Sequence, residues 1–384
     1  MNVVTVGAGV FVATFAAWWS ARAIVRRSQN DSRALDDTWG GMRKVHVFPT
    51  PRVGGFAVAA GLWAGAFVCS FLDAECDGLA VLLACAAPAF VWGIIEDVSK
   101  RGAVAVRYAL TASATALAYF LLDARITQLQ VPLLDQLLEF SVFAFVFTVF
   151  AVAGVAQSMN IIDGLNGLAG VTGLCASIGL AIVAAIVGDS FVLSAACMLG
   201  GSLFGFLAVN YPRGRIFLGD GGAYLVGLLL AELSVLLVHR NSEVSPWLPL
   251  ILLLYPIWET LFSMVRRAWH RRSPMKPDAL HLHTLVYRRV VRWKGFDAKP
   301  SDYVIRNSIA SLYLWVIPVV GALVGLAFWQ DSFALKVSAA AFGVVYTLAY
   351  RRLVHFGVPA WLVVRVKTAH EREDFDGEEL SPKG

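Results

Sequence analysis

Long apolar stretches separated by short polar breaks run through most of the chain. A helix needs about 20 consecutive apolar residues to cross the hydrocarbon core of a bilayer. The pattern predicts about eleven transmembrane helices, and the first is retained because Arg26 and Arg27 follow it while no basic residue precedes it. The predicted spans lie near residues 3–25, 53–72, 79–95, 103–122, 137–156, 168–187, 190–209, 222–238, 247–265, 309–329 and 333–350.

Composition excludes a compact water-soluble enzyme. Hydrophobic residues make up 58% of the 384 residues and charged residues 15%, against about 45–50% and about 25% in soluble domains. We therefore expect an all-α, polytopic integral membrane protein. The net charge of +5 is typical of membrane topology rather than of nucleic-acid binding, so no nucleic-acid partner is expected.

The distribution of Lys and Arg predicts the orientation in the membrane. Cytoplasmic segments carry an excess of basic residues, and only Arg125, Arg240 and Lys336 fall on the opposite side. This distribution places the N-terminus outside and the C-terminus in the cytoplasm. The chain then divides into a transmembrane domain over 1–350, with cytoplasmic segments 26–52, 96–102, 157–167, 210–221 and 266–308, and a cytoplasmic tail over 351–384.

Two adjacent acids, Glu96 and Asp97, stand where the third predicted span reaches the cytoplasm. Paired acids this close to hydrocarbon are costly unless a cation, a water-filled cavity or a basic partner receives them. They are suited to hold Mg²⁺, which prefers oxygen ligands and bridges to substrate phosphate, or one of them to act as a general base. The alternative is a solvated helix end with Lys100 and Arg101 as surface partners.

The string MNIIDGLNGLAG contains Asn160, Asp163 and Asn166 at every third position. One helical turn would place these side chains roughly on one face, and the glycines would let backbone approach a ligand closely. That arrangement suits a sugar, a ribose or a metal-bound phosphate. An Asx-rich turn between helices is the alternative.

The string NYPRGRIFLGDGG begins at Asn210 and ends in a Gly-rich turn around Asp220, where a span starts. Glycines at a helix N-terminus expose backbone amides that suit phosphate, and Asp220 is suited to hold Mg²⁺ that bridges to it. The arginines of the string fit positive-inside anchoring equally well. A GDGG string alone is weak evidence of a site.

The most basic segment, 266–308, contains His281 and His283. In an extended stretch their side chains would point the same way and contact a pyrophosphate or, as the less favoured interpretation, a zinc ion. A basic surface segment that binds lipid headgroups is the alternative. Lipid phosphate contact and interfacial anchoring are likewise both open for Lys44 in the string RKVHVFPTPRVGG.

Two further acids lie deeper in predicted spans, where ionisable groups are costly. For Glu232 we expect an interhelical hydrogen bond. Glu259, close to Pro256, is less easily explained as a packing residue.

Taken in order, these strings resemble the polyprenyl-phosphate N-acetylhexosamine-1-phosphate transferases, a family related to the phospho-N-acetylmuramoyl-pentapeptide transferase. The resemblance runs from RKVHVFPTPRVGG to HLHTLVYRR. It implies transfer of N-acetylhexosamine 1-phosphate from a UDP-N-acetyl sugar to undecaprenyl phosphate or another polyprenyl phosphate, with release of UMP. It also implies Mg²⁺ as the cofactor and an active site that faces the cytoplasm at the bacterial inner membrane.

The resemblance further implies residue roles. Asp220 matches the metal-binding Asp of the FxGD string. Glu96 and Asp97 match an Asp-Asp pair that serves the metal or deprotonates the attacking phosphate, and Asp163 is the acid of the NxxDG string, expected to be catalytic. Substrate binding is expected for residues in the matching strings, namely Lys44, Lys100, Asn160, Asn166, Asn210, His281 and His283.

Three positions depart from the family pattern: Glu96 replaces an Asp, Asn166 replaces the second Asp of DGxDG, and Thr284 replaces the third His of HxHH. The strings EDVSKR and IIDGLNGLAG are similar to the branch that starts O-antigen or other surface polysaccharides, which disfavours a peptidoglycan pentapeptide substrate. Two alternatives stay open. One is a transporter or flippase for lipid-linked sugars, which should carry midplane charges and related halves; the other is an inactive member that acts as an assembly scaffold. A homodimer is compatible with the sequence.

Overall fold

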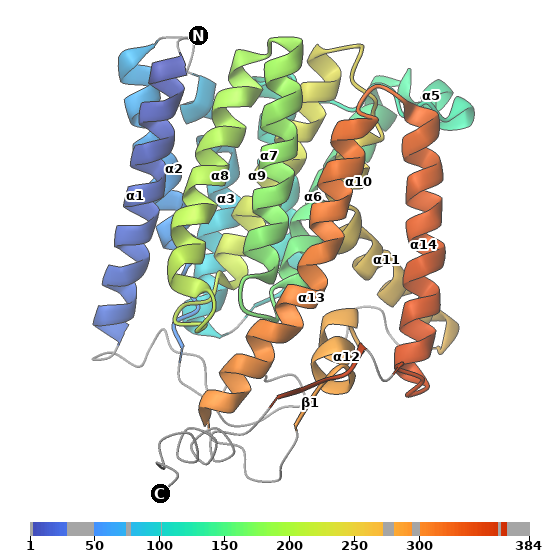
Figure 1. Cartoon of the computed structure of the whole chain (residues 1–384). Coiled ribbons are helices and arrows are strands. Elements are labelled where there is room, and N and C mark those ends of the chain that lie inside the picture. Colours follow the sequence, from blue (N-terminus) through green and yellow to red (C-terminus); the bar gives the residue numbers. More distant parts are fainter. Residues whose placement is uncertain are drawn as a thin grey trace, which may run out of the picture.

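Helices make up most of the computed structural model (Figure 1), which describes residues 3–28, 50–73, 78–100, 102–271, 280–293, 300–359 and 362–366. The helices are α1 (Val3–Ser28), α2 (Gly55–Leu72), α3 (Gly78–Ser99), α4 (Val104–Leu121), α5 (Pro132–Leu138), α6 (Ser141–Ile162), α7 (Leu168–Val187), α8 (Ser190–Asn210), α9 (Gly219–Arg240), α10 (Leu248–Leu252), α11 (Leu254–Trp269), α12 (Leu282–Arg289), α13 (Pro300–Ala327) and α14 (Ser332–Val354). The predicted all-α, polytopic architecture is confirmed.

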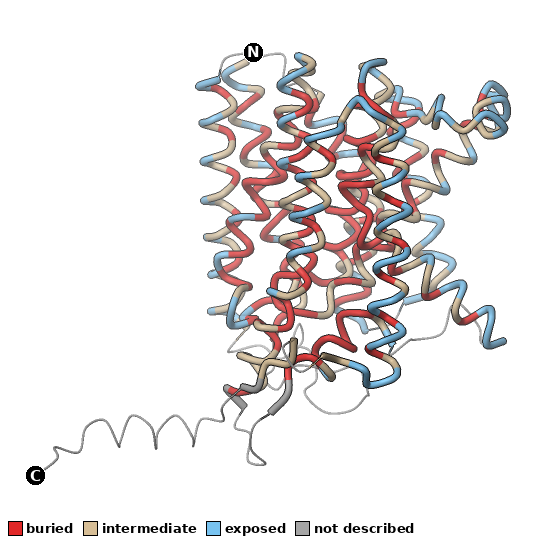
Figure 2. Tube along the Cα trace, turned by 45° about the vertical axis from the view of Figure 1, so that its right-hand side comes forward, coloured by how far each residue is buried: buried red, intermediate tan, exposed pale blue. Residues whose placement is uncertain are grey.

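Helix α9 occupies the centre of the bundle. In the apolar stretch of α9, 94% of the residues are buried inside the protein, against 17% in that of α14. Helix α9 packs on α3 and α6. Apolar and small residues cover almost every side of α9, so the helix has no polar face to turn toward water. Figure 2 shows the buried residues gathered inside the bundle and the exposed ones on its outer faces.

Within the described part of the chain, ten helices have the length and apolar composition to cross a membrane. The predicted span 247–265 is the exception, because it is divided into α10 and α11 around Leu253. Pro256 has no N–H to donate to the carbonyl of Leu252, which weakens the helix at this point. The expectation of one continuous helix over this range is therefore wrong.

Helix α11 has two contrasting faces. Glu259, Ser263 and Arg267, spaced four residues apart, are buried, while Leu261 and Met264 are exposed. An exposed apolar face is expected of a helix that contacts lipid rather than water. The polar stripe consequently turns into the protein, toward the segment that leads into α12.

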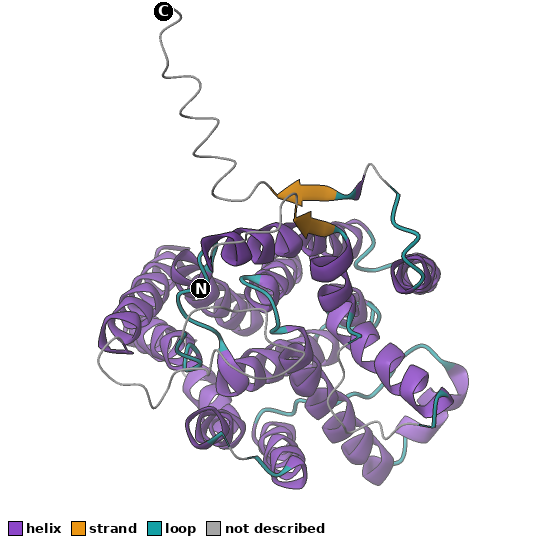
Figure 3. Ribbon diagram, turned by 90° about the horizontal axis from the view of Figure 1, so that it is seen from below, coloured by secondary structure: helices purple, strands orange, loops and turns teal. Residues whose placement is uncertain are grey.

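Two short strands lie at one end of the bundle. Strand β1 (Val291–Trp293) pairs in parallel with β2 (Val364–Val366), at the edge of the helices when the bundle is viewed along its axis (Figure 3). The sequence pattern did not predict this pair. The prediction of an extended stretch around the two histidines is also wrong for His283. Only His281 is extended, because α12 begins directly after it.

The polar strings of the sequence meet at one end of the bundle. The ends of α3 and α6 and the beginnings of α9 and α12 all lie there, and the start of α1 lies at the opposite end (Figure 1). The site end also carries Arg26 and Arg27 at the end of α1. Its cytoplasmic orientation stays a prediction from the basic residues.

Candidate active site

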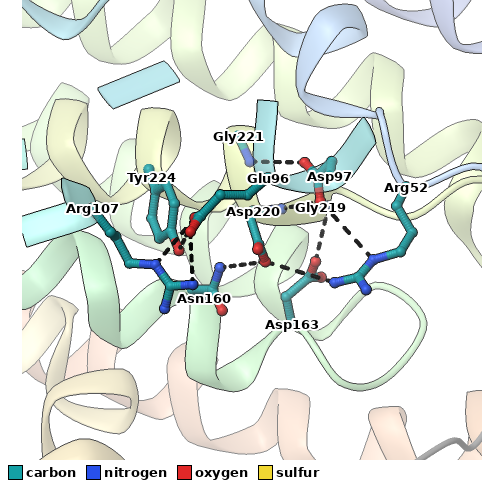
Figure 4. A network of polar contacts seen from close by, with 10 residues as sticks. All are labelled: Arg52, Glu96, Asp97, Arg107, Asn160, Asp163, Gly219, Asp220, Gly221 and Tyr224. Carbon is teal, nitrogen blue, oxygen red and sulfur yellow. Dashed lines mark hydrogen bonds and ion pairs between the residues drawn. The ribbon is translucent and has the colours of Figure 1, made fainter. Parts of the chain in front are cut away.

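The N-terminus of α9 is the centre of a polar cluster (Figure 4). Asp97 accepts hydrogen bonds from the N–H groups of Asp220 (2.9 Å) and Gly221 (3.0 Å), and Asp163 accepts one from the N–H of Gly219 (3.2 Å). Carboxylates at a helix start satisfy its free N–H groups and interact favourably with the helix dipole. The ends of α3 and α6 are thereby tied to the first turn of α9.

Gly219 is required by the geometry of that turn. Its φ of +76° is one that residues with a Cβ rarely adopt. A Cβ here would also clash with the carbonyl oxygen of Arg52 and lie 2.6 Å from Oδ2 of Asp97. The close approach of these two groups to α9 therefore depends on the absence of a side chain.

Asp220 differs from Asp97 in its exposure. The Asp220 side chain is 21% exposed, and that of Asp97 is fully buried. Oδ1 of Asp220 accepts a hydrogen bond from Asn160 (2.8 Å) and lies 3.6 Å from the guanidinium of Arg52. Asp220 is thus an acid that a ligand in solution can reach, and Asn160 and Arg52 hold it in place.

Glu96 faces away from Asp97, its neighbour in sequence. Consecutive side chains on an α-helix point about 100° apart. The Glu96 carboxylate accepts two hydrogen bonds from the Arg107 guanidinium (3.1 and 3.2 Å) and one from the Tyr224 hydroxyl (3.2 Å). Because bidentate pairs of this kind are strong and directional, Glu96 is a paired, buried acid rather than a free one.

The carboxylates of the cluster are oxygen donors of the kind that Mg²⁺ prefers. Burial raises the pKa of Asp163 to about 7; the Asp220 carboxylate adds to the rise, while Arg52 and the Gly219 N–H oppose it. Mg²⁺ typically binds one or two carboxylates and completes its shell with water and substrate phosphate. Within the described residues, no three His, Cys, Asp or Glu side chains form a metal site on their own. A Mg²⁺ ion at these carboxylates would therefore need a substrate phosphate and water to complete its ligands.

His281 and His283 lie beside this cluster. Their rings stack in parallel, with centroids 5.4 Å apart, so they do point the same way, although a helix start rather than an extended strand arranges them. A Cβ on Gly164 would lie 2.6 Å from Nε2 of His283. The His283 ring therefore packs against the turn that directly follows Asp163.

Asn166 and Asn210 direct their side chains to backbone. Asn166 donates to the carbonyl of Pro212 (2.9 Å) and Asn210 to that of Ile216 (2.6 Å). Helix α6 ends at Ile162 and a non-helical turn follows, so Asn166 leaves the face that the three-residue spacing predicted. Both asparagines fix the loops around the cluster instead of joining it.

The two predicted lysines are placed differently. Lys100 is exposed immediately after α3. Lys44 lies outside the described residues.

Sequence reasoning missed three members of the cluster. It included Arg52 only as part of the basic string RKVHVFPTPRVGG, and it singled out neither Arg107 nor Tyr224. A signal existed for Arg107, which lies inside an apolar run where an ionisable group needs a partner. Tyr224 lies four residues after Asp220 on α9, and so on nearly the same face.

Glu232 is the remaining buried acid of α9. It is 1% exposed, and neither carboxyl oxygen has a hydrogen-bond partner within the described residues. The expected interhelical hydrogen bond is therefore wrong. Glu232 stands apart from the cluster at the helix start.

Comparison with known proteins connects this geometry to a family. Residues 79–238 match the model of a protein family described as Glycosyl transferase family 4. The matched range includes Glu96, Asp97, Asn160, Asp163 and Asp220. A Bacillus subtilis protein named "Probable undecaprenyl-phosphate N-acetylglucosaminyl 1-phosphate transferase" is 30% identical over 285 residues, which cover 72% of this chain and 78% of that protein. A Mycobacterium leprae protein named "Decaprenyl-phosphate N-acetylglucosaminephosphotransferase" is 30% identical over 325 residues, covering 73% and 80%.

Proposed function

The chain belongs to glycosyl transferase family 4, and from this membership we propose that it transfers N-acetylhexosamine 1-phosphate to a polyprenyl phosphate. The observation that carries the proposal is the acidic cluster at the start of α9, where partly exposed Asp220 is held by Asn160 and Arg52. The proposed donor is a UDP-N-acetyl sugar. The proposed acceptor is undecaprenyl or another polyprenyl phosphate.

The proposed reaction is a phosphoryl transfer. A phosphate oxygen of the lipid attacks the β-phosphorus of the UDP-sugar, the bond from that phosphorus to the bridging oxygen breaks, and UMP leaves with the electron pair. The product is a polyprenyl diphosphate sugar. Catalysis of this kind depends mainly on alignment and on neutralisation of charge.

The residues of the cluster divide this work. Asp220 would hold Mg²⁺, which supplies positive charge to the diphosphate when bound. Asp97 fixes the first turn of α9 and so the position of Asp220. His281 and His283 would contact the donor diphosphate from the side of the Asp163 turn.

No free general base is needed at this site. The lipid phosphate is already anionic near neutral pH, so it attacks without losing a proton to the protein. The contacts support this assignment, because Asp97 is engaged by two backbone N–H groups and Glu96 by Arg107 and Tyr224. We therefore assign both acids to orientation and charge balance.

The proposed setting is the bacterial plasma membrane, with the cluster facing the cytoplasm, where a soluble sugar nucleotide meets a membrane lipid. The product would start O-antigen or another surface polysaccharide. A flippase is the weaker alternative, because it would concentrate charge near the midplane, whereas this cluster lies at one end of the bundle (Figure 1).

Turnover in detergent tests the proposal. Purified protein is supplied with undecaprenyl phosphate, MgCl₂ and each of several UDP-N-acetyl sugars, and release of UMP is measured. We expect release with at least one sugar, and none when the lipid is omitted or EDTA is in excess. Absence of release with every sugar would overturn the enzyme proposal and favour the scaffold alternative.

A further inference from the structure

Glu259 is a buried acid outside the cluster, and it uses both of its carboxyl oxygens. Its side chain on α11 is fully buried. One oxygen, Oε2, accepts a hydrogen bond from the Tyr346 hydroxyl (2.7 Å). The other, Oε1, lies 2.9 Å from Nδ1 of His281 and accepts the N–H of Leu282 (3.1 Å). Glu259 therefore joins α11, α14 and the start of α12.

These contacts define the state of the His281 ring. An ionised carboxylate only accepts hydrogen bonds, so the hydrogen of the His281–Glu259 contact belongs to Nδ1. The partner of one ring nitrogen fixes the orientation and the protonation pattern of the other. Nε2 is then the ring atom left for a ligand. To donate a hydrogen bond, Nε2 must also carry a proton, and the buried Glu259 carboxylate would balance the positive charge of that doubly protonated ring.

The position of the ring relates this contact to the active site. His281 is stacked on His283, and His283 packs against Gly164, next to Asp163. The His281 side chain retains 13% exposure, whereas the Glu259 side chain has none. A ligand at the cluster can therefore reach His281, whereas the buried Glu259 carboxylate cannot contact that ligand directly.

We propose that Glu259 is a positioning residue that holds His281 so that Nε2 donates to the diphosphate of the sugar nucleotide. This inference deepens the proposed function and rests on it for the identity of the ligand. The competing interpretation is structural, in which Glu259 only connects three helices. The two interpretations differ in whether the effect of Glu259 depends on His281.

A double-mutant cycle separates them. Glu259→Gln, His281→Gln and the combined variant are compared for the dissociation constant of UDP-GlcNAc and for its KM and kcat. Each single change should weaken donor binding about tenfold with little change in kcat. The combined variant should bind no more weakly than His281→Gln alone, because the proposal gives Glu259 its effect on the ligand through His281.

Two control variants complete the cycle. Glu232→Gln removes a carboxyl that is equally buried but has no described partner, and it should leave donor binding unchanged. Tyr346→Phe removes the hydrogen bond to Oε2 and leaves the contact with His281, so it should affect melting temperature more than donor affinity.

Losses that multiply in the combined variant would overturn the positioning role, as would unchanged donor affinity in folded Glu259→Gln. If Glu259→Gln does not fold, Glu259→Asp, which retains the charge on a shorter side chain, takes its place in the cycle. Wild-type protein that binds UDP-GlcNAc without any turnover would overturn the proposed function instead, and the cycle in binding would still decide the role of Glu259.

Discussion

Asp97 and Asp220 belong to one cluster, but their contacts give them different duties. Asp97 is buried under two backbone N–H groups, and Asp220 is open to the surface of the site. Glu96, next to Asp97 in sequence, serves a third purpose as the partner of Arg107. The adjacency of two acids in sequence identified the region but could not assign these duties, because helical rotation separates neighbouring side chains.

Replacement of these two aspartates should therefore have different consequences. Asp220→Asn removes the proposed metal ligand and should lower kcat by about a thousandfold while the melting temperature is unchanged. Asp97→Asn cannot accept both N–H groups of the α9 turn, so it should lower both kcat and the melting temperature. UMP release and thermal unfolding of the two variants in the same detergent provide the comparison. Equal loss of melting temperature in both would contradict the division of duties.

The Glu96–Arg107 pair makes a second prediction at this scale. Arg107→Gln leaves the buried Glu96 carboxylate without its cation, and breaking such a pair on one side is strongly destabilising. Because Arg107 is partly exposed, we expect a loss of about 2 kcal/mol in the free energy of unfolding. Adding Glu96→Gln should restore part of it. A double variant that is less stable than Arg107→Gln would contradict the pairing.

At the scale of elements, the length of the apolar stretches predicted most helices well, because a membrane span is decided by length and hydropathy. The divided α10–α11 segment was not predicted, since its total hydropathy conceals the missing N–H of Pro256. The asparagine spacing also misled, because α6 ends at Ile162 and a turn follows, as in the alternative of an Asx-rich turn between helices. The β1–β2 pair joins segments far apart in the chain, and three-residue strands carry no periodic signal.

The first turn of α9 offers a prediction about backbone geometry. Gly219→Ala should abolish UMP release, since a methyl group at φ +76° is strained and would contact Arg52 and Asp97. Gly154→Ala, in the middle of α6 with open space around the position, is the matched control and should retain activity. Wild-type kinetics for folded Gly219→Ala would show that this turn does not determine the site.

At the scale of the whole molecule, the two ends of the bundle differ in their polar residues. The polar cluster occupies one end, and the predicted outer loops at the other end hold few basic residues. The rule of basic residues predicts orientation without reference to chemistry, yet it assigns the acidic cluster to the side where sugar nucleotides are made.

Accessibility in intact cells tests this orientation. Ser242→Cys lies in an exposed loop at the predicted outer end, and Phe356→Cys lies exposed at the end that carries the cluster. A membrane-impermeant maleimide should label the first variant in intact cells and the second only after lysis, with the parent protein as background. The opposite pattern would place the cluster outside the cell.

The fate of the β-phosphate tests the central claim most directly. UDP-GlcNAc, or whichever UDP-N-acetyl sugar supports turnover, is labelled with radioactive phosphorus at the β-position and incubated with the protein, undecaprenyl phosphate and Mg²⁺. The account predicts that the label moves entirely into the lipid fraction while unlabelled UMP accumulates in equal amount. Label that stays on the nucleotide as UDP, or that appears as free phosphate, would contradict transfer of a sugar 1-phosphate.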